Sequence, residues 1–170
     1  MNTISPSPLS ENRRDNHKQI VVSIFEEKDT EEYQRFLLTM AGTGMATFEY
    51  TLEWKEIIQK HFGFTPYYLL GKDEHGQIVG VLPLFKAVSI FGKRFVSTPY
   101  AIFTGILAND EETAKELLNY AKRLAQEQQV DFLEIRERPV SFRKDKNSFN
   151  ALSTEQGFPC VKNVFNFSLH

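Results

Sequence analysis

The sequence predicts a mixed α/β (α+β) fold in which helices flank one central sheet. Short runs rich in Val, Ile and Phe, residues that suit a pleated and buried surface, recur along the chain and predict strands. Other segments carry apolar residues at helical spacing, separated by polar residues. The resulting order is strand, helix, helix, strands, helix, strand and strand. A length of 170 residues is typical of one domain.

The chain opens with a polar segment, residues 1–18, that has no hydrophobic periodicity and is expected to be a disordered tail. One folded domain is expected over 19–170. Residues 20–25, IVVSIF, predict the first strand. Asp29 is expected to cap the helix that follows, with Glu32 three residues later as its reciprocal capping partner.

A second helix is predicted to begin at its cap, Thr51, and to end at Gly63, a residue that favours the left-handed conformation found at helix C-termini. Strands are predicted at 67–71 and 77–85. The connection between them, 72–76 (KDEHG), has the chemistry of a tight turn, in which glycine supplies a positive φ.

The most apolar stretch of the chain runs over 78–107 and predicts two or three consecutive strands with tight connections. It is interrupted by Pro83, Gly92, Pro99 and Gly105. Because proline cannot donate a hydrogen bond to a neighbouring strand, Pro83 is expected at a sheet edge or a bulge and not within a central strand.

The remaining elements follow in the last third of the chain. A helix is predicted to open at Asn109, with Glu112 as its capping partner and a regular apolar stripe after it. The next strand is predicted at 131–136, and residues 139–150 are expected to form a charged loop or a short helix. The alternating pattern at 163–169 predicts a last strand.

Composition argues against several classes of function. Net charge is −2 with 25% charged residues, so there is no basic bias that would favour a DNA partner. The N-terminus lacks the apolar core of a secretory signal, and no apolar run approaches the ~18 residues of a membrane-spanning helix. The sequence therefore predicts a cytoplasmic protein without a transmembrane segment.

Cysteine and histidine usage narrows the chemistry further. Cys160 is the only cysteine, so no intrachain disulfide can form, and a small buried hydrophobic role is favoured over that of a nucleophile. His17, His75 and His170 have no metal-ligand spacing to another histidine or to Cys160, so no metal is predicted. Neither a Gly-x-Ser-x-Gly nor a catalytic-cysteine motif is present, and no catalytic residue is assigned.

Several short motifs occur in an order and spacing that resemble one family. They are FEYTLEW (48–54), HFGFTPYYL (61–69), LPL (82–84), FGKR (91–94), VSTPY (96–100) and DFLEIR (131–136). Together they resemble the first half of FemAB-like transferases, members of the acetyltransferase (GNAT) superfamily. Among these, the sequence is most similar to the proteins associated with bacterial exopolysaccharide and exosortase systems. The resemblance covers roughly residues 20 to 169 and implies a GNAT-like domain with a mixed central sheet.

The resemblance also implies an activity. Family members transfer an acyl or aminoacyl group to an amine of a cell-wall or polysaccharide precursor, and their first domain helps to hold the acceptor. The implied donor is an acyl-CoA or an aminoacyl-tRNA, with no tightly bound cofactor. The implied partners are a glycan-precursor or other small-molecule substrate and a second GNAT-like domain, absent from this chain. If the half-size chain is a genuine protein, catalysis is expected to need a second copy in a homodimer or a partner chain.

The motif for acetyl-CoA binding is not found. Members of the superfamily that bind acetyl-CoA carry Arg or Gln three residues before a Gly-x-Gly/Ala loop at a helix N-terminus. Gly42-Thr43-Gly44 follows a predicted helix instead, and Thr39 occupies the position of the Arg or Gln. A helix C-cap is favoured over a phosphate-binding loop. The sequence also departs from the family at Thr104-Gly105, where members carry paired glycines.

The candidate substrate-binding residues are polar or aromatic side chains in or beside apolar strands. They are Arg94, Ser97, Tyr100, Glu134, Arg136, Arg138, Tyr67 and Trp54. On a strand, Glu134, Arg136 and Arg138 share one face. An ordinary ladder of ion pairs is the favoured interpretation, and a binding site for an anionic substrate is the alternative, because arginine matches carboxylate and phosphate groups. Tyr67 and Trp54 are interpreted as core residues, with stacking on a sugar or nucleotide as the alternative.

Three functions stay open at this point. The first is an acyl or aminoacyl transferase of the cell envelope that works by positioning and oxyanion stabilisation. The second is a non-catalytic GNAT-like binding or interaction module. The third is a membrane-surface protein, because Ile90 and Phe91 form an apolar tip beside Lys93 and Arg94.

Overall fold

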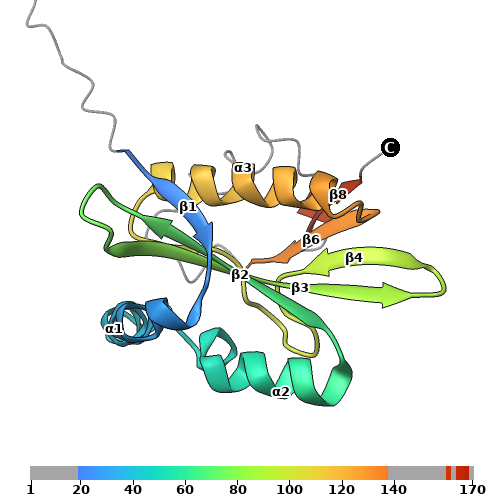
Figure 1. Ribbon diagram of the computed structural model, residues 1–170, viewed down its shortest axis with the longest axis horizontal. Coiled ribbons are helices and arrows are strands. Elements are labelled where there is room, and N and C mark those ends of the chain that lie inside the picture. The colour runs from blue at the N-terminus through green and yellow to red at the C-terminus, as the bar shows by residue number, and fades with distance from the viewer. Residues whose placement is uncertain (1–18, 138–159, 162–163, 169–170) are drawn as a thin grey trace, which may run out of the picture.

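The computed structural model describes residues 19–137, 160–161 and 164–168. Figure 1 shows one twisted sheet with the longest helix on one face and two helices on the other. The first half contains β1 (Val21–Ile24), η1 (Glu27–Asp29), α1 (Thr30–Ala41), η2 (Phe48–Tyr50), α2 (Leu52–Phe62), β2 (Thr65–Lys72) and β3 (Ile78–Ser89). The second half contains β4 (Gly92–Val96), β5 (Leu107–Ala108), α3 (Glu111–Glu127), β6 (Phe132–Arg136), β7 (Cys160–Val161) and β8 (Val164–Ser168).

The described strands form one mixed sheet in the order β1-β2-β3-β4-β6-β8-β7, with β5 beside β3. Neighbouring strands are antiparallel except β4 and β6, which are parallel. The chain reaches β6 from this region through α3, as a parallel pair requires a crossover connection. The predicted mixed α/β fold with a central sheet is therefore confirmed.

Alternation along the strands produces two hydrophobic cores. On β2, Leu69 packs toward α3, whereas its neighbours Tyr68 and Leu70 pack toward α1 and α2. This is the period of two that a strand imposes on its side chains. The core beneath α3 includes Leu82, Leu84, Phe95, Leu117, Leu118, Leu124 and Leu133. The core beneath α1 and α2 includes Tyr33, Phe36, Met40, Ile58, Val81 and Phe85.

The expectation that Pro83 lies at an edge or bulge is wrong. β3 is an interior strand, and Pro83 is aligned with Tyr68 of β2. On the other side of β3, β5 pairs with residues 80–81 and β4 with residues 85–89. Residues 82–84 face the gap between these two short strands, so a proline without an N–H is tolerated there.

The helix caps follow the predicted residues in part. Thr51 caps α2 as predicted, with its Oγ1 accepting a hydrogen bond from the Trp54 N–H at 3.2 Å. Gly63 ends the same helix in the left-handed conformation, with φ of 69°. For α3 the prediction was one residue early, because the cap is Asp110 and not Asn109.

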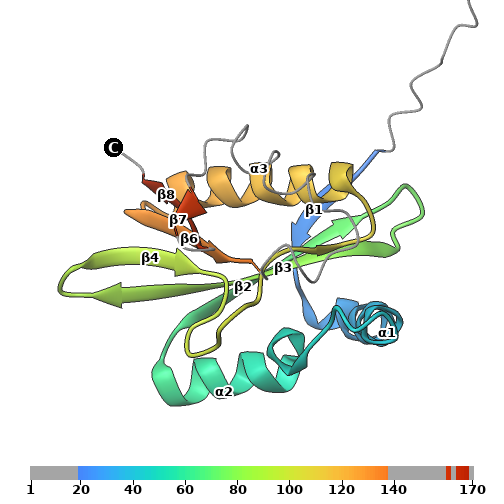
Figure 2. The ribbon, with the colours of Figure 1, turned by 180° about the vertical axis from the view of Figure 1, so that it is seen from behind.

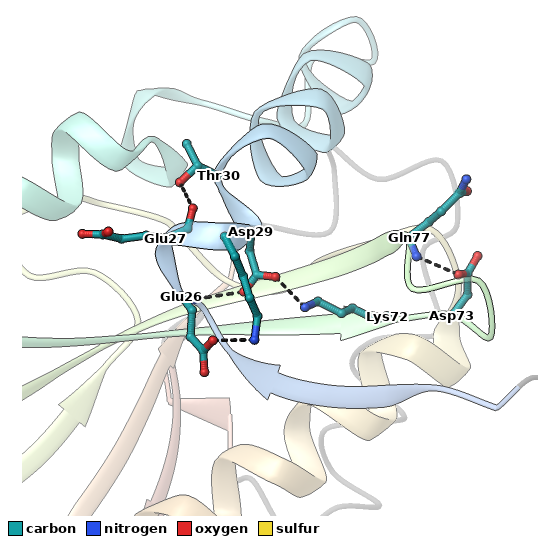
Figure 3. Close-up of polar contacts among 8 residues, drawn as sticks. Glu26, Glu27, Asp29, Thr30, Lys72, Asp73 and Gln77 are labelled. Carbon is teal, nitrogen blue, oxygen red and sulfur yellow. Dashed lines mark hydrogen bonds and ion pairs between the residues drawn. The ribbon is translucent and has the colours of Figure 1, made fainter.

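Asp29 occupies the predicted N-cap position of α1, but its side chain does not make the predicted capping hydrogen bond. Asp29 has helical backbone angles and ends the short η1 helix, and its Oδ2 accepts a hydrogen bond from the Glu26 N–H at 3.0 Å. Its Oδ1 accepts from Lys72 Nζ at 2.7 Å, which fastens the start of α1 to β2 (Figure 3). Burial raises the pKa of Asp29, but the hydrogen bonds from Lys72 and from the Glu26 amide outweigh it and leave the pKa below its usual value.

Other sequence predictions have different outcomes. The turn before β3 forms as expected, with Asp73 accepting hydrogen bonds from the His75 and Gln77 amides and Gly76 at φ 77°. The last strand forms as β8. The tail at 1–18, the segment 139–150 and the side chain of Cys160 lie outside the described residues. Within the described ranges, no helix is both long and apolar enough to cross a membrane.

Candidate functional site

The candidate site is centred on a loop, residues 97–106, which separates two short strands that both pair with β3. The connection between β4 and β5 is therefore long, not tight as the sequence predicted. β4 also runs parallel to β6, and their last aligned pair is Val96 with Glu134. Figure 2 shows the loop leaving the end of β4, approaching α2 and returning to β5. The C-terminal ends of β4 and β6 thus meet beside this loop.

Arg136, the last residue of β6, supports the loop through its backbone and its side chain. Its amide donates to Ser97 Oγ at 2.9 Å, and its Nη1 donates to the carbonyls of Thr98 at 3.3 Å and Ala101 at 3.2 Å. Its Nε donates to Glu134 Oε1 at 2.6 Å, in an ion pair whose side chains are 29% and 18% exposed. A guanidinium binds a carboxylate or phosphate in a bidentate way through Nε with Nη2 or through Nη1 with Nη2. Because Nε and Nη1 already donate hydrogen bonds within the protein, each of these two pairs is partly occupied.

Glu137 holds the far end of the loop. Its Oε1 accepts a hydrogen bond from the Ile106 amide at 2.6 Å, and the residue is buried. A Cβ atom added to Gly105 would lie 2.0 Å from that same oxygen, so any larger residue here would force the carboxylate to move. The Thr104 amide donates to the Arg136 carbonyl at 2.9 Å. Thr104 and Ile106 are therefore both hydrogen-bonded to the end of β6 and the residue after it.

A second set of hydrogen bonds ties the loop to the helices on the opposite side. The Tyr50 hydroxyl in η2 donates to the Gly105 carbonyl at 3.2 Å, and the Tyr33 hydroxyl in α1 donates to the Tyr50 carbonyl at 2.6 Å. Burial raises the pKa of Tyr33 well above its usual value. Tyr33 therefore stays protonated and remains a donor, and it does not act as a base at neutral pH.

Tyr100 forms the exposed tip of the loop. Its φ is 63°, in the left-handed region that residues other than glycine seldom adopt, and its side chain is 65% exposed. Its ring lies 4.3 Å from that of Phe62 and stacks on Phe64 with centroids 6.2 Å apart. These contacts place an aromatic surface at the C-terminal end of α2.

The structure brings together four of the predicted site residues: Ser97 and Tyr100 in the loop, and Glu134 and Arg136 on β6. Glu134 and Arg136 share a face as their spacing predicts, and they bind each other. Arg138 lies outside the described residues. The contacts of this group are with one another, with the backbone of the loop and with the rings of Phe62 and Phe64.

The other predicted residues lie elsewhere. Tyr67 is partly buried on the α3 face, where its hydroxyl donates to Gln128 Oε1 at 3.1 Å. Trp54 packs edge-on against Phe48 at 5.7 Å on the α2 side of the sheet, and its indole N–H is buried without a partner among the described residues. Arg94 is exposed on β4. These side chains do not converge with the loop residues.

Sequence reasoning missed two residues that shape the site, Glu137 and Tyr50. Glu137 directly follows the predicted strand, among other charged residues, and in the sequence it looks like an ordinary exposed side chain. Tyr50 precedes the α2 cap and lies in the FEYTLEW motif (48–54), whose spacing does not indicate a contact with the loop. One available signal was Gly105, because glycine is needed where a backbone and a buried group approach closely.

A separate pocket of about 430 Å³ lies between α1 and the junction of η2 with α2. Its wall is mostly apolar and includes Leu37, Leu38, Ala41 and Phe48, with Gln34 and Glu53 as polar members. Thr47, another lining residue, has a buried Oγ1 without a hydrogen-bond partner in the described part of the chain. The volume lies in the range of small-molecule sites, and Tyr33 connects this wall to the loop.

The N-terminus of α3 is where a helix dipole and backbone N–H groups would favour an anion. Here Asp110 Oδ1 accepts from the Thr113 amide at 2.8 Å, and Glu111 and Glu112 place two carboxylates in the first turn. This helix end is capped and negatively charged, so it does not fit a pyrophosphate group. Within the described residues, no group of three or more His, Cys, Asp or Glu could hold a metal ion.

Comparison with known proteins places the fold. No protein-family model matches the sequence, and no curated protein matches it. A GNAT-family acetyltransferase from Staphylococcus aureus superposes with a TM-score of 0.58 at 15% identity, over 89% of this chain and 100% of that one. A GNAT-family acetyltransferase from Brucella melitensis, solved in complex with acetyl-CoA, superposes with a TM-score of 0.57 at 9% identity, over 91% and 90%. The chain therefore has the fold of GNAT acetyltransferases.

Proposed function

We propose that this chain is the acceptor-holding GNAT-fold domain of an acyl or aminoacyl transferase that acts on an amine of a cell-wall or polysaccharide precursor. The observation that carries the proposal is that a chain with an acetyltransferase fold has a capped, acidic N-terminus on α3. The fold supports acyl transfer in general, but Asp110, Glu111 and Glu112 would repel the phosphates of an acyl-CoA. The donor is then bound by another domain, as the FemAB resemblance implies.

The pocket beside α1 supports an acceptor-holding role. Its apolar wall suits the body of a small molecule, and the Glu53 carboxylate can pair with an ammonium group. Gln34 adds both donors and an acceptor for hydroxyl or amide groups. The hydrogen bonds from Tyr33 to Tyr50 and from Tyr50 to Gly105 give the pocket a rigid connection to the loop at the end of β4.

Binding measurements on the purified chain test this proposal. The probes are acetyl-CoA, glucosamine and a lysine-containing pentapeptide, measured by calorimetry and by the shift of the thermal midpoint. We expect an amine probe to bind, and Glu53→Gln to weaken its binding about tenfold. Glu56→Gln is the control, because it changes an exposed carboxylate of the same helix, and it should leave amine binding unchanged. Tight binding of acetyl-CoA, or amine binding that Glu53→Gln leaves intact, would overturn the proposal.

A non-catalytic binding module is the second candidate, and the same capped and acidic α3 end favours it. The two candidates differ in turnover. The transferase proposal expects labelled acyl or aminoacyl groups to reach the acceptor amine once the donor-binding domain or partner from the same source is present. A binding module would retain the amine probe under these conditions without any labelled product.

A further inference from the structure

The hairpin between β3 and β4 ends in an apolar tip. Ile90 and Phe91 are 94% and 90% exposed, and Val88, which precedes them, is also exposed. Figure 1 shows this hairpin projecting beyond the helices, with its tip away from both α2 and α3. Two large apolar side chains this exposed on a projecting turn are more than the scattered apolar exposure that is normal for a protein surface.

The hairpin is also basic. Residues 86–96, KAVSIFGKRFV, contain three cations and no acid, in a chain whose net charge is −2. Lys93 and Arg94 are exposed and lie directly after the tip. Lys86 lies further back, where its Nζ donates to the Gln128 carbonyl at 3.2 Å and to its side-chain oxygen at 2.9 Å. The exposed cations of the hairpin are therefore concentrated beside the apolar tip.

The backbone of the turn is held by hydrogen bonds. Gly92 has a φ of 120°, and a Cβ atom there would lie 2.3 Å from Asp131 Oδ2. That same oxygen accepts a hydrogen bond from the Lys93 amide at 2.8 Å. Ser89 Oγ donates to the Gly92 carbonyl at 3.3 Å and accepts from the Phe91 amide at 3.2 Å. Binding through the tip should therefore cost little conformational entropy of the backbone.

We propose that the β3–β4 hairpin docks this protein on an anionic lipid surface. Ile90 and Phe91 enter the boundary between headgroups and acyl chains, and Lys93 and Arg94 contact the anionic headgroups. A second copy that docks tip to tip is a poorer occupant, because that two-fold contact would place this basic tip against itself. The proposal does not depend on which reaction the domain serves.

Vesicle sedimentation at low salt tests it, with vesicles of phosphatidylcholine alone and vesicles that also contain roughly 30% phosphatidylglycerol, which gives the surface a negative potential. We expect binding to the mixed vesicles. Ile90→Ser with Phe91→Ser should lower the partition coefficient about tenfold or more, and Lys93→Gln with Arg94→Gln about fivefold for each cation removed. The controls are Val21→Ser, an exposed apolar residue on β1, and Lys60→Gln with Lys115→Gln, two exposed cations on helices.

The outcomes separate lipid binding from self-association. Loss of binding in the tip variants with unchanged circular dichroism and thermal midpoint supports the proposal, as does unaltered binding in both controls. Absence of vesicle binding by the unmodified chain would overturn it. So would a dimer in light scattering that Ile90→Ser with Phe91→Ser dissociates while the chain ignores vesicles, because the tip would then be a contact between copies.

Discussion

Replacing Arg136 tests whether Glu134 and Arg136 at the end of β6 stabilise the loop or bind a ligand. Arg136→Ala removes the ion pair with Glu134 and the two hydrogen bonds to the carbonyls of Thr98 and Ala101. Hydrogen bonds to a charged group contribute about 1.5–3 kcal/mol each when buried. Because these side chains retain some exposure, we discount the sum to about 3 kcal/mol of unfolding free energy, which includes the cost of leaving Glu134 unpaired.

The expected loss is measurable in two ways. Urea unfolding should show a free energy lower by about 3 kcal/mol, and the thermal midpoint should fall by roughly 6–12 °C for a domain of this size. Arg136→Lys should recover less than half, because lysine keeps the charge but lacks the planar group that reaches two carbonyls and a carboxylate together. Hydrogen exchange should quicken at the amides of residues 97–106 in both variants.

Arg94→Ala is the matched control, since Arg94 is an exposed arginine on the neighbouring strand and its removal should change stability by less than about 0.5 kcal/mol. If Arg136→Ala behaves like this control and leaves exchange in the loop unchanged, the reasoning from these hydrogen bonds is refuted. A rise in stability would indicate an arginine held in place for a ligand, because functional residues are often retained at a cost in stability.

Three further substitutions test the surrounding contacts. Gly105→Ala should lower the free energy of unfolding by about 2–4 kcal/mol in urea, because the new methyl group displaces the buried Glu137 carboxylate; a loss below about 1 kcal/mol would contradict the close approach. Tyr50→Phe should cost about 1 kcal/mol and speed exchange in the loop, and unchanged exchange would argue against the hydrogen bond to the Gly105 carbonyl. Because the pKa of Asp29 is lower in the folded chain, its pairing with Lys72 should stabilise the fold above about pH 3.9, the pKa of an unfolded aspartate. This stabilisation should be lost as the pH falls through the lowered pKa of folded Asp29. The free energy of unfolding in urea should therefore differ less between pH 7 and pH 3 in Asp29→Asn than in the unmodified chain.

The fold could be predicted because each of its signals is local. The continuous apolar run in β2 and the apolar stripe of α3 are visible within a few residues. The run indicates a strand that is buried on both faces, and the stripe determines which face of the helix is buried. The errors arise where the deciding contact is distant in sequence. Pro83 was assigned to an edge because nothing nearby indicates that β4 and β5 leave a gap beside it. The Asp29 carboxylate was expected to cap α1, because nothing nearby in the sequence indicates its partner Lys72 on β2.

The candidate site was predictable only for the residues that share a strand. A period of two places Glu134 and Arg136 on one face, and their ion pair follows from that spacing. The partners in residues 97–106 could not be inferred, because a loop without periodicity does not reveal which carbonyls point toward β6. Gly105 and Glu137 illustrate the same limit, since their contact is specified by neither local pattern nor composition.

The acidic start of α3 differs from these cases, because the residues that form it are adjacent in the sequence. Asp110, Glu111 and Glu112 stand together directly after a predicted strand, at the start of the most regular helical stripe in the chain. A helix end with three acidic residues disfavours phosphate whatever its tertiary surroundings, since the dipole and the capped amides act within one turn. The missing acetyl-CoA motif and the capped, acidic start of α3 both support the proposal that the donor is bound outside this chain. A triple replacement of these residues by Ser, Gln and Gln keeps a capping hydroxyl and removes the charge. Weak acetyl-CoA binding that appears only in this variant would show that charge excludes the donor, and continued absence of binding would mean that the helix end lacks the shape for it as well.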